Sequence, residues 1–300
     1  MADLSVNIAG VEFKNPIIAA SGTIGFGHEY SEFYPLSVFG GISCKGTTLK
    51  ERPGNPPPRI AETPMGMLNA VGLQNPGVEH FIKYDLPWLK QQDTVAIANV
   101  AGSTAEDYCK MAEILSDTDI DMIELNISCP NVKEGGVQFG TSCESVAAIT
   151  KAVRAHCKKP LIIKLSPNVS DIASIAMAAE SEGADAVSLI NTLTGMRINT
   201  RKPIIANITG GMSGPAVFPV AVRMVWQVKK AVKIPVIGMG GITTWKDAVE
   251  MMMAGADAIQ IGTALFTDPY SPVKIAEGLN AYLDKNGMKS VTELTGTVMC

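Results

Sequence analysis

Short runs of apolar, mostly β-branched residues recur along the chain and are separated by amphipathic segments. The runs cover residues 16–21, 40–46, 94–100, 121–128, 160–166, 184–192, 234–241 and 256–265. They are continuously apolar instead of alternating, which is typical of strands that a parallel sheet buries on both faces. We therefore expect a parallel sheet at the centre of the fold.

The segments between these runs carry helix start and stop signals. Ser103-Thr104, Ser170-Asp171 and Thr243-Thr244 precede helical patterns and offer side-chain oxygens to free helix N–H groups, while Gly183 and Gly255 are stop signals. This alternation predicts a (β/α)8 TIM barrel, with residues 1–300 as a single domain. A doubly wound sheet is the alternative, but the chain lacks an early GxGxxG motif that opens a helix.

Three segments lie outside the alternation. Residues 47–75 and 193–212 are too long for ordinary connections, and we expect them to be long loops over the C-terminal face of the barrel that act as lids or binding elements. Residues 5–13 alternate around Ala9-Gly10, which predicts an N-terminal β-hairpin at the bottom of the barrel.

Composition and charge narrow the classes of function. The chain is 46% hydrophobic and 18% charged, with a net charge of −4, so it has no basic footprint for nucleic acid. We see no signal peptide and no apolar run long enough to cross a membrane, and we expect a cytoplasmic protein. The cysteines at 44, 109, 129, 143, 157 and 300 form no closely spaced pair, which argues against a metal or iron–sulfur site in this chain.

Polar or glycine residues lie at the carboxyl end of every predicted strand, where the chemistry of such barrels gathers. They are Ser21-Gly22, Lys45-Gly46, Asn99, Asn126 with Cys129, Lys164, Asn191-Thr192, Gly240-Gly241 and Gly262-Thr263. The last two turns resemble a phosphate cradle of bare backbone N–H groups. The ligand is then expected to carry a phosphate, as flavin mononucleotide (FMN), a sugar phosphate or pyridoxal phosphate does.

Lys164 fits two kinds of chemistry. It could form a Schiff base in an aldolase-like lyase, or it could place a positive charge beside a reduced flavin. The amides of Asn69, Asn99, Asn126, Asn131 and Asn191 favour a planar heterocycle with imide edges, because each offers both a donor and an acceptor.

Several stretches together resemble the class 1 dihydroorotate dehydrogenases, and more closely the FMN subunit of their NAD-linked type B members. They are AASGT (19–23), SCKGTT (43–48), MLNAVGLQNPG (67–77), NISCPN (126–131), IIKLSPN (162–168), INTLTGM (190–196), NITGGMSGPA (207–216), GMGGI (238–242) and IGTA (261–264). The resemblance covers nearly the whole chain. It implies oxidation of dihydroorotate to orotate in pyrimidine biosynthesis.

The resemblance also implies roles for individual residues. Cys129 would be the catalytic base that takes the C5 proton of dihydroorotate while a hydride passes from C6 to FMN. The substrate would be surrounded by Lys45, Asn69, Ala70, Val71, Gly72, Leu73, Asn126, Asn131, Asn191 and Thr192. FMN would be held by Ala20, Ser21, Gly22, Lys45, Gly46, Asn99, Asn126, Lys164, Ile190, Gly214, Gly240, Gly241, Gly262 and Thr263.

By the same resemblance, electrons would leave through a partner subunit that carries FAD and an iron–sulfur cluster, in a heterotetramer of two catalytic and two partner chains. The alternatives are a homodimeric, fumarate-linked type A enzyme and a flavin barrel like that of dihydropyrimidine dehydrogenase. A tRNA dihydrouridine synthase is a further rival, but it should be basic and carry an RNA-binding module, whereas this chain has a net charge of −4. An aldolase-like lyase would be colourless, and a barrel that only binds a phosphate ligand would not need Cys129.

Overall fold

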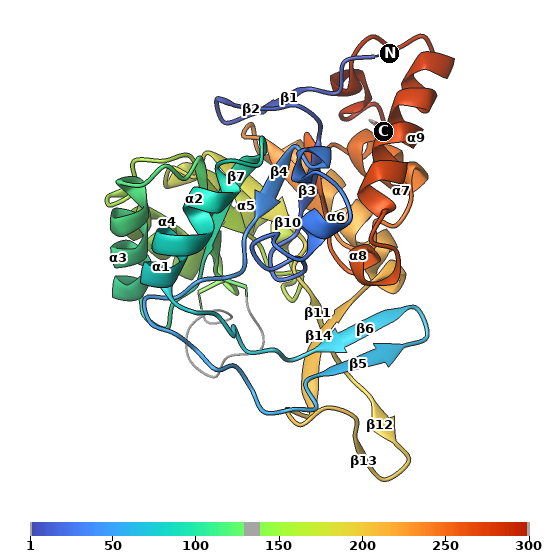
Figure 1. Cartoon of the computed structure of the whole chain (residues 1–300). Coiled ribbons are helices and arrows are strands. Elements are labelled where there is room, and N and C mark those ends of the chain that lie inside the picture. The colour runs from blue at the N-terminus through green and yellow to red at the C-terminus, as the bar shows by residue number, and fades with distance from the viewer. Residues whose placement is uncertain (1, 129–138, 299–300) are drawn as a thin grey trace.

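The computed structural model describes residues 2–128 and 139–298, and its centre is a closed barrel of parallel strands (Figure 1). The strands follow one another around the barrel in the order β10-β15-β16-β3-β4-β7-β8-β9. They are β3 (Ile17–Ala19), β4 (Gly41–Ser43), β7 (Val95–Val100), β8 (Met122–Asn126), β9 (Leu161–Lys164), β10 (Ala186–Leu189), β15 (Val236–Met239) and β16 (Ala258–Ile261). Each lies within one of the predicted apolar runs, so the (β/α)8 TIM barrel prediction is confirmed.

Helices surround the barrel and cover the outer faces of its strands (Figure 1). They are α1 (Val78–His80), α2 (Leu86–Leu89), α3 (Ala105–Ser116), α4 (Cys143–Arg154), α5 (Ile172–Ser181), α6 (Phe218–Ala231), α7 (Trp245–Met253), α8 (Ala264–Thr267) and α9 (Ser271–Lys285). A π-helical stretch, η3 (Phe81–Asp85), joins α1 to α2. Short 3-10 turns are η1 (Tyr30–Glu32), η2 (Leu36–Val38), η5 (Pro215–Val217) and η6 (Val291–Leu294). In the described part of the chain, no helix is both long and apolar enough to cross a membrane.

The predicted helix start signals cap the helices that they precede. Thr104 accepts a hydrogen bond from the backbone N–H of Asp107, and Thr244 does the same for Asp247. Asp171 accepts from the N–H groups of Ala173 and Ser174. These caps satisfy the first free N–H groups of α3, α7 and α5, and they fix the point at which each helix leaves the strand before it.

The predicted N-terminal hairpin is present as β1 (Val6–Ile8) and β2 (Val11–Phe13), which pair antiparallel. The turn between them has positive φ at Ala9 (53°) and Gly10 (86°), the conformation that two-residue hairpins favour. Phe13 is fully buried, and its ring would contact a Cβ placed on Gly41, the first residue of β4. The hairpin therefore packs at the beginning of the barrel strands, and both chain termini lie at this end (Figure 1).

The two segments expected to be long loops contain strands of their own. β5 (Ile60–Thr63), β6 (Gly66–Asn69), β11 (Leu193–Met196) and β14 (Thr209–Ser213) form a four-stranded sheet in the order β11-β14-β6-β5. A small hairpin, β12 (Ile198–Asn199) with β13 (Lys202–Pro203), extends from it. The segments pair with each other across the chain, β14 with β6, and this long-range pairing was not visible in either segment alone. We call this unit the projecting sheet.

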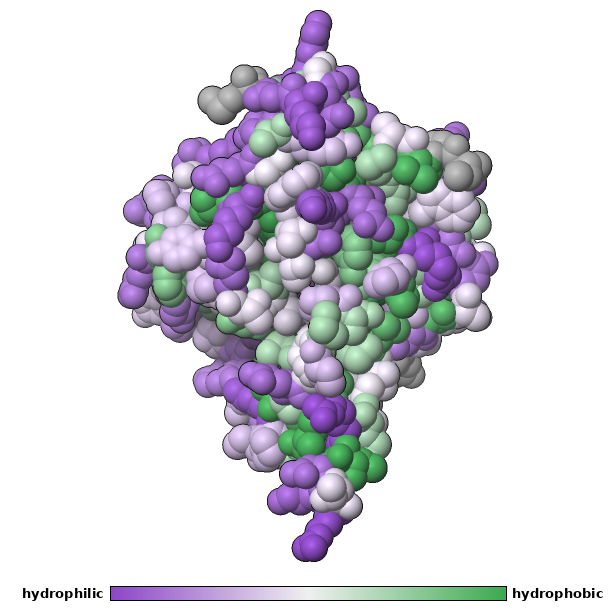
Figure 2. Space-filling view, turned by 90° about the vertical axis from the view of Figure 1, so that its right-hand side faces the viewer, coloured by the Kyte–Doolittle hydropathy of each residue, from purple (hydrophilic) through white to green (hydrophobic). Residues whose placement is uncertain are grey.

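The projecting sheet extends from the barrel on the side away from the chain termini (Figure 1). Figure 2 shows hydrophobic residues among hydrophilic ones on this narrow end of the molecule, whose tip is hydrophilic. Its exposed apolar side chains are Ile60, Met65, Met196, Ile198 and Ile208.

Candidate active site

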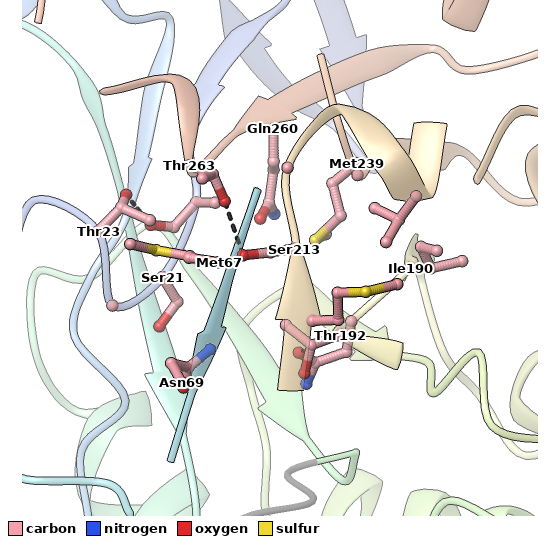
Figure 3. A pocket seen from close by; sticks show the side chains of 18 of the residues that line it. Ser21, Thr23, Met67, Asn69, Ile190, Thr192, Ser213, Met239, Gln260 and Thr263 are labelled. Atoms are coloured by element: carbon pink, nitrogen blue, oxygen red, sulfur yellow. Dashed lines mark hydrogen bonds between the residues drawn. The ribbon is translucent and has the colours of Figure 1, made fainter. Parts of the chain in front are cut away.

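A cavity lies at the mouth of the barrel, between the carboxyl ends of the barrel strands and the projecting sheet (Figure 3). Loops that begin at these strand ends converge on one face, which is where the active sites of such barrels lie. The cavity brings together these predicted site residues: Ala20, Ser21, Gly22, Lys45, Gly46, Asn69, Val71, Gly72, Leu73, Asn126, Lys164, Ile190, Asn191, Thr192, Gly214, Gly240, Gly241, Gly262 and Thr263.

The other predicted residues do not line the cavity in the structure. Asn99 and Ala70 are fully buried behind its wall. Asn99 accepts a hydrogen bond from the wall residue Asn126, and Ala70 precedes the wall residue Val71. Cys129 and Asn131 lie outside the described residues, so the prediction of a base at Cys129 rests on the sequence.

Glycines form one end of the cavity. Gly240 and Gly241 follow β15 with φ of 121° and 76°, which favours glycine. A Cβ on Gly241 would lie 2.7 Å from Cβ of Phe218, the first residue of α6, and 2.8 Å from the carbonyl oxygen of Gly214. The backbone therefore runs close to the beginning of α6 with no side chain in between. Such a surface exposes N–H groups near a helix N-terminus, the environment that phosphate groups prefer.

The projecting sheet supplies a further part of the cavity wall. Met67 and Asn69 of β6 and Ser213 of β14 point toward the strand ends in Figure 3. Thr263, just after β16, donates a hydrogen bond of 2.8 Å from Oγ1 to Oγ of Ser213. This hydrogen bond joins the end of a barrel strand to the sheet above it.

The predicted substrate segment 70–73 is held by hydrogen bonds to the preceding loop. Asn55 donates its backbone N–H to the carbonyl of Val71 and its Nδ2 to the carbonyl of Ala70, each at 2.9 Å. Gly72 has φ of 73°, and a Cβ there would lie 2.5 Å from Nδ2 of Asn55. The backbone at this edge of the cavity is therefore fixed, and a side chain at position 72 would collide with its support.

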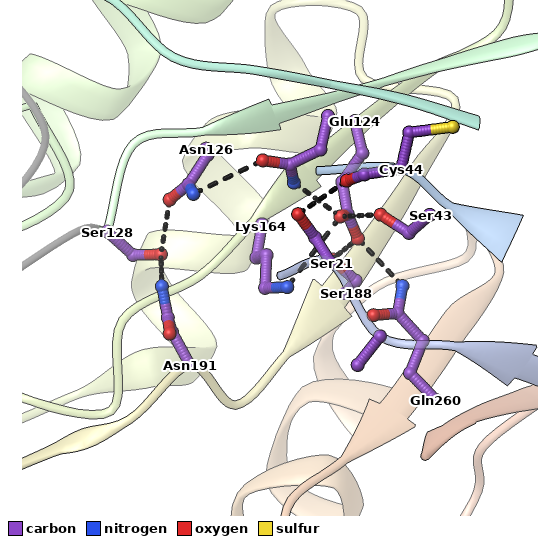
Figure 4. A network of polar contacts seen from close by, with 12 residues as sticks. Ser21, Ser43, Cys44, Glu124, Asn126, Ser128, Lys164, Ser188, Asn191 and Gln260 are labelled. Atoms are coloured by element: carbon purple, nitrogen blue, oxygen red, sulfur yellow. Dashed lines mark hydrogen bonds and ion pairs between the residues drawn. The ribbon is translucent and has the colours of Figure 1, made fainter. Parts of the chain in front are cut away.

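A buried ion pair lies beneath the cavity floor (Figure 4). Lys164, at the end of β9, lines the cavity, and its Nζ lies 3.7 Å from Oε2 of Glu124, which is fully buried. The Glu124 carboxylate also accepts hydrogen bonds from Ser43 Oγ (2.7 Å), Asn99 Nδ2 (2.7 Å), Ser188 Oγ (2.7 Å) and Gln260 Nε2 (2.8 Å). Burial raises the pKa of the Glu124 carboxyl, but Lys164 and the hydrogen bonds from Ser43, Ser188 and Gln260 outweigh burial, so the pKa lies below its ordinary value. The group under the floor is therefore a carboxylate.

A chain of hydrogen bonds runs from this carboxylate to Asn191 in the cavity wall (Figure 4). Asn126 donates from Nδ2 to Oδ1 of Asn99 at 3.3 Å. Ser128 donates to Oδ1 of Asn126 at 3.4 Å, and Asn191 donates from Nδ2 to Oγ of Ser128 at 2.7 Å. The asparagines predicted at separate strand ends are thus one connected set.

Sequence reasoning missed Glu124 and several residues of the cavity wall. The latter are Thr23, Ile60, Met67, Met212, Ser213, Val217, Met239, Ile242, Thr243, Gln260, Ala264 and Phe266. One signal could have identified two of the missed residues: Glu124 and Gln260 are polar residues within continuously apolar strands, where burial requires a partner. The apolar wall residues carried no such signal, because the projecting sheet brings many of them into place.

The donors and acceptors of the cavity fit FMN. Gln260 Oε1 is buried and has no donor among the described residues, so it can accept from a hydroxyl or N–H group of a bound molecule. The Lys164 ammonium suits a ring that becomes negatively charged on reduction, and the bare backbone at Gly240 and Gly241 suits a phosphate.

Comparisons with known proteins show the family of this chain. The family model described as dihydroorotate dehydrogenase matches residues 3–283. Proteins named dihydroorotate dehydrogenase B (NAD(+)), catalytic subunit, include one from Bacteroides thetaiotaomicron, 60% identical over 99% of both chains. Others come from Alkaliphilus oremlandii, 55% identical over 98% of both chains, and Petrotoga mobilis, 53% identical over 99% of this chain and 100% of the relative. This chain belongs to the dihydroorotate dehydrogenase family.

Proposed function

We propose that this chain is the catalytic subunit of a type B, NAD⁺-linked dihydroorotate dehydrogenase, which oxidises dihydroorotate to orotate at an FMN in the mouth of the barrel. The observation that carries the proposal is one cavity that combines three features: Lys164 paired with Glu124 beneath the floor, the linked amides of Asn126 and Asn191, and a glycine-lined end. Family membership and the names of the relatives support the same reaction. Our expectation of a cytoplasmic location stays a prediction.

In this proposal, the floor and the glycine-lined end hold the cofactor. When bound, FMN supplies the acceptor for the hydride that leaves C6 of dihydroorotate. Lys164 stabilises negative charge at the ring, since its ammonium is buried beside the cavity. The residues proposed to hold the isoalloxazine ring and ribityl chain are Ala20, Ser21, Gly22, Lys45, Gly46, Asn126, Lys164 and Ile190, with Asn99 supporting Asn126 from behind the wall. Those proposed for the phosphate are Gly214, Gly240, Gly241, Gly262 and Thr263.

The substrate would lie on the side of the projecting sheet. The amides of Asn69, Asn126 and Asn191, with Asn131 and Thr192, would pair with its imide edges, and Lys45 would neutralise its carboxylate. Cys129, which follows β8 by three residues, would accept the C5 proton as a thiolate. The proton and the hydride then leave neighbouring carbons, which forms the double bond of orotate.

A second subunit completes the electron path in this proposal. The relatives are named catalytic subunits, which implies another subunit in those proteins. We propose a partner that carries FAD and an iron–sulfur cluster, with two copies of each chain in a heterotetramer. The exposed apolar side chains of the projecting sheet support association with a further chain. The names of the relatives favour this arrangement over a type A homodimer linked to fumarate.

One spectroscopic experiment tests the proposed function. We expect the purified chain, reconstituted with FMN under anaerobic conditions, to show flavin absorbance bands that bleach when dihydroorotate is added. Dihydrouracil, which lacks the carboxylate, is the matched control and should bleach them far more slowly if Lys45 recognises that group. A protein that binds no FMN, or whose bound flavin dihydroorotate does not reduce, would contradict the proposal. Equal rates with both compounds would favour a barrel like that of dihydropyrimidine dehydrogenase.

A further inference from the structure

Glu124 is the point at which the barrel strands meet inside the protein (Figure 4). Side chains from β4, β7, β9, β10 and β16 reach its carboxylate on β8. Glu124 does not itself line the cavity, whereas its partners Lys164 and Gln260 do. Anything that Glu124 does for a bound molecule must therefore pass through these neighbours.

An ionised carboxylate accepts hydrogen bonds and donates none, so every neighbour must turn a donor toward it. Asn99 therefore directs Nδ2 to Glu124, and its Oδ1 faces Asn126. Asn126 in turn directs Nδ2 to Asn99 and leaves Oδ1 to accept from Ser128, whose oxygen accepts from Asn191. The charge on Glu124 thus sets which atom each of these amides presents.

The same argument applies to Gln260. Its Nε2 is committed to Glu124, which leaves Oε1 as an acceptor. Within the described residues this oxygen is buried without a donor, although Gln260 lines the cavity. A buried acceptor of this kind is costly unless something donates to it, and the donor expected here is a hydroxyl or N–H group of the bound cofactor.

Lys164 receives both charge balance and position from Glu124. Its side chain is 6% exposed, and Glu124 is its ion-pair partner in the part of the chain that the structure describes. The separation of 3.7 Å is longer than a hydrogen bond, so the carboxylate attracts the ammonium without holding its N–H groups in short contacts.

We propose that Glu124 is the positioning residue of the cofactor floor: its carboxylate holds Lys164 and Gln260 toward the flavin and orients the chain of asparagine amides that faces the substrate. The inference rests on the proposed function, because it takes FMN as the molecule above the floor. It assigns Glu124, Ser43, Ser188 and Gln260 to the working site, although sequence reasoning singled out none of them.

The variant Glu124→Gln tests this proposal, since it keeps the shape and removes the charge. Gln offers one acceptor and one donor where the carboxylate offers two acceptors, so at least one neighbour must turn around. We expect the dissociation constant for FMN, measured by quenching of flavin fluorescence on the stripped protein, to rise at least tenfold. We also expect a more positive midpoint potential of bound FMN. The negative charge beneath the ring is lost, and the positive charge of Lys164 is no longer balanced.

A structural role alone predicts a different outcome. The variant would then unfold at a lower temperature, but its FMN affinity and midpoint potential would match those of the wild type, and this result would overturn the proposal. Thr150→Val is the matched control, since Thr150 is a buried polar residue on α4 whose hydroxyl has no partner within the described residues. Its substitution should leave both flavin properties unchanged.

Ser188→Ala provides a second test that keeps the carboxylate, in case Glu124→Gln does not fold. Ser188 does not line the cavity and donates to Oε1 of Glu124. With one donor fewer, Glu124 should take up a proton at a higher pH. The charged group that faces Glu124 within 4 Å in the described structure is Lys164, and this variant leaves it in place. The pH below which FMN affinity falls should therefore move upward, and an unmoved profile would overturn the proposal. Failure of the wild type to bind FMN would instead contradict the proposed function.

Discussion

Glu124 shows what a single buried charge requires of its surroundings. A carboxylate out of contact with water is costly, and here four neutral donors and one ammonium offset that cost. Leaving either charge of such a pair alone typically costs about 3–5 kcal/mol. An apolar residue at position 124 would therefore destabilise the barrel in addition to disturbing the floor of the cavity.

The proposed base, Cys129, leads to a prediction about the rate of flavin reduction. A thiol has a reference pKa of about 8.5, so a few per cent is thiolate at neutral pH. We expect the rate of flavin reduction by dihydroorotate to rise with pH toward this value, and Cys129→Ala to lower that rate by at least about 100-fold, the usual contribution of a positioned base. Stopped-flow absorbance of the bound flavin measures it.

Two substitutions complete this experiment. Cys129→Ser should retain part of the rate, since a hydroxyl can take the same place as a poorer base. Cys143→Ala, at an exposed free cysteine that begins α4, should behave as the wild type. An unchanged rate in Cys129→Ala would show that Cys129 is not the catalytic base.

Residues at or just beyond the carboxyl ends of strands were predicted from the sequence, and Glu124 in the middle of a strand was not. Lys164 and Asn126 end β9 and β8, and Asn191 lies just beyond β10, where polar groups gather in a barrel. Glu124 lies in the middle of an apolar run, and its partners Ser43 and Gln260 are 81 and 136 residues away. Only closure of the barrel shows that these residues meet.

At the scale of elements, the connection from β15 to α7 combines the cavity wall with a helix cap. Gly240 and Gly241 line the cavity, and Asp247 in the first turn of α7 accepts the backbone N–H of Thr243 at 2.9 Å and of Thr244 at 2.7 Å. Burial raises the pKa of the Asp247 carboxyl, but hydrogen bonds from Thr243 and Thr244 outweigh it, so the pKa lies below its ordinary value. The ionised form therefore stabilises this connection.

A pH dependence of stability follows for Asp247. A carboxyl with a folded pKa below its unfolded value, about 3.9 for Asp, stabilises fully above that value and loses its contribution as the pH falls through the folded pKa. We expect Asp247→Asn to lower the free energy of unfolding by about 1 kcal/mol at pH 7, as loss of a helix cap does. The difference from the wild type should shrink below about pH 4.

Chemical denaturation at several pH values measures this effect. Glu250→Gln is the matched control, since it removes the same charge from an exposed position on the same helix. A difference between Asp247→Asn and the wild type that stays constant between pH 7 and pH 3 would show that ionisation of Asp247 does not stabilise the fold.

The strands of the projecting sheet could not be predicted from the local sequence pattern. Residues 47–75 and 193–212 are rich in turn residues, and each reads as loop by itself. Within the segments β5 pairs with β6 and β11 with β14, but β6 pairs with β14 over a separation of more than 140 residues, so the joining of the two pairs into one sheet leaves no local signal. The eight barrel strands, by contrast, are buried on both faces and carry their signal locally.

At the scale of the whole molecule, the cavity draws on the entire length of the chain. Its lining begins at Ala20 and ends at Phe266, and it includes both the barrel and the projecting sheet. A ligand that contacts residues so far apart in the sequence binds only the folded chain. Its binding free energy is therefore added to the stability of the fold.

Thermal unfolding tests this linkage. At a free FMN concentration 100 times its dissociation constant, the free energy of unfolding should rise by about 2.7 kcal/mol, so the melting temperature should increase by several degrees. Riboflavin, which lacks the phosphate, should raise it less if the glycine-lined end holds that group. Identical melting temperatures with and without saturating FMN would contradict the placement of the cofactor in this cavity.

The side chains that reach Glu124 from five other strands also constrain which substitutions the barrel interior tolerates. A substitution at Ser43, Asn99, Lys164, Ser188 or Gln260 alters the surroundings of one shared carboxylate, so the effects of two such substitutions should not add. An apolar barrel interior is reachable only by changing most of these positions together, because each intermediate leaves a buried charge or donor unpaired. We therefore expect Glu124 and its five partners to be substituted together, whereas the apolar wall residues around them can be substituted one at a time.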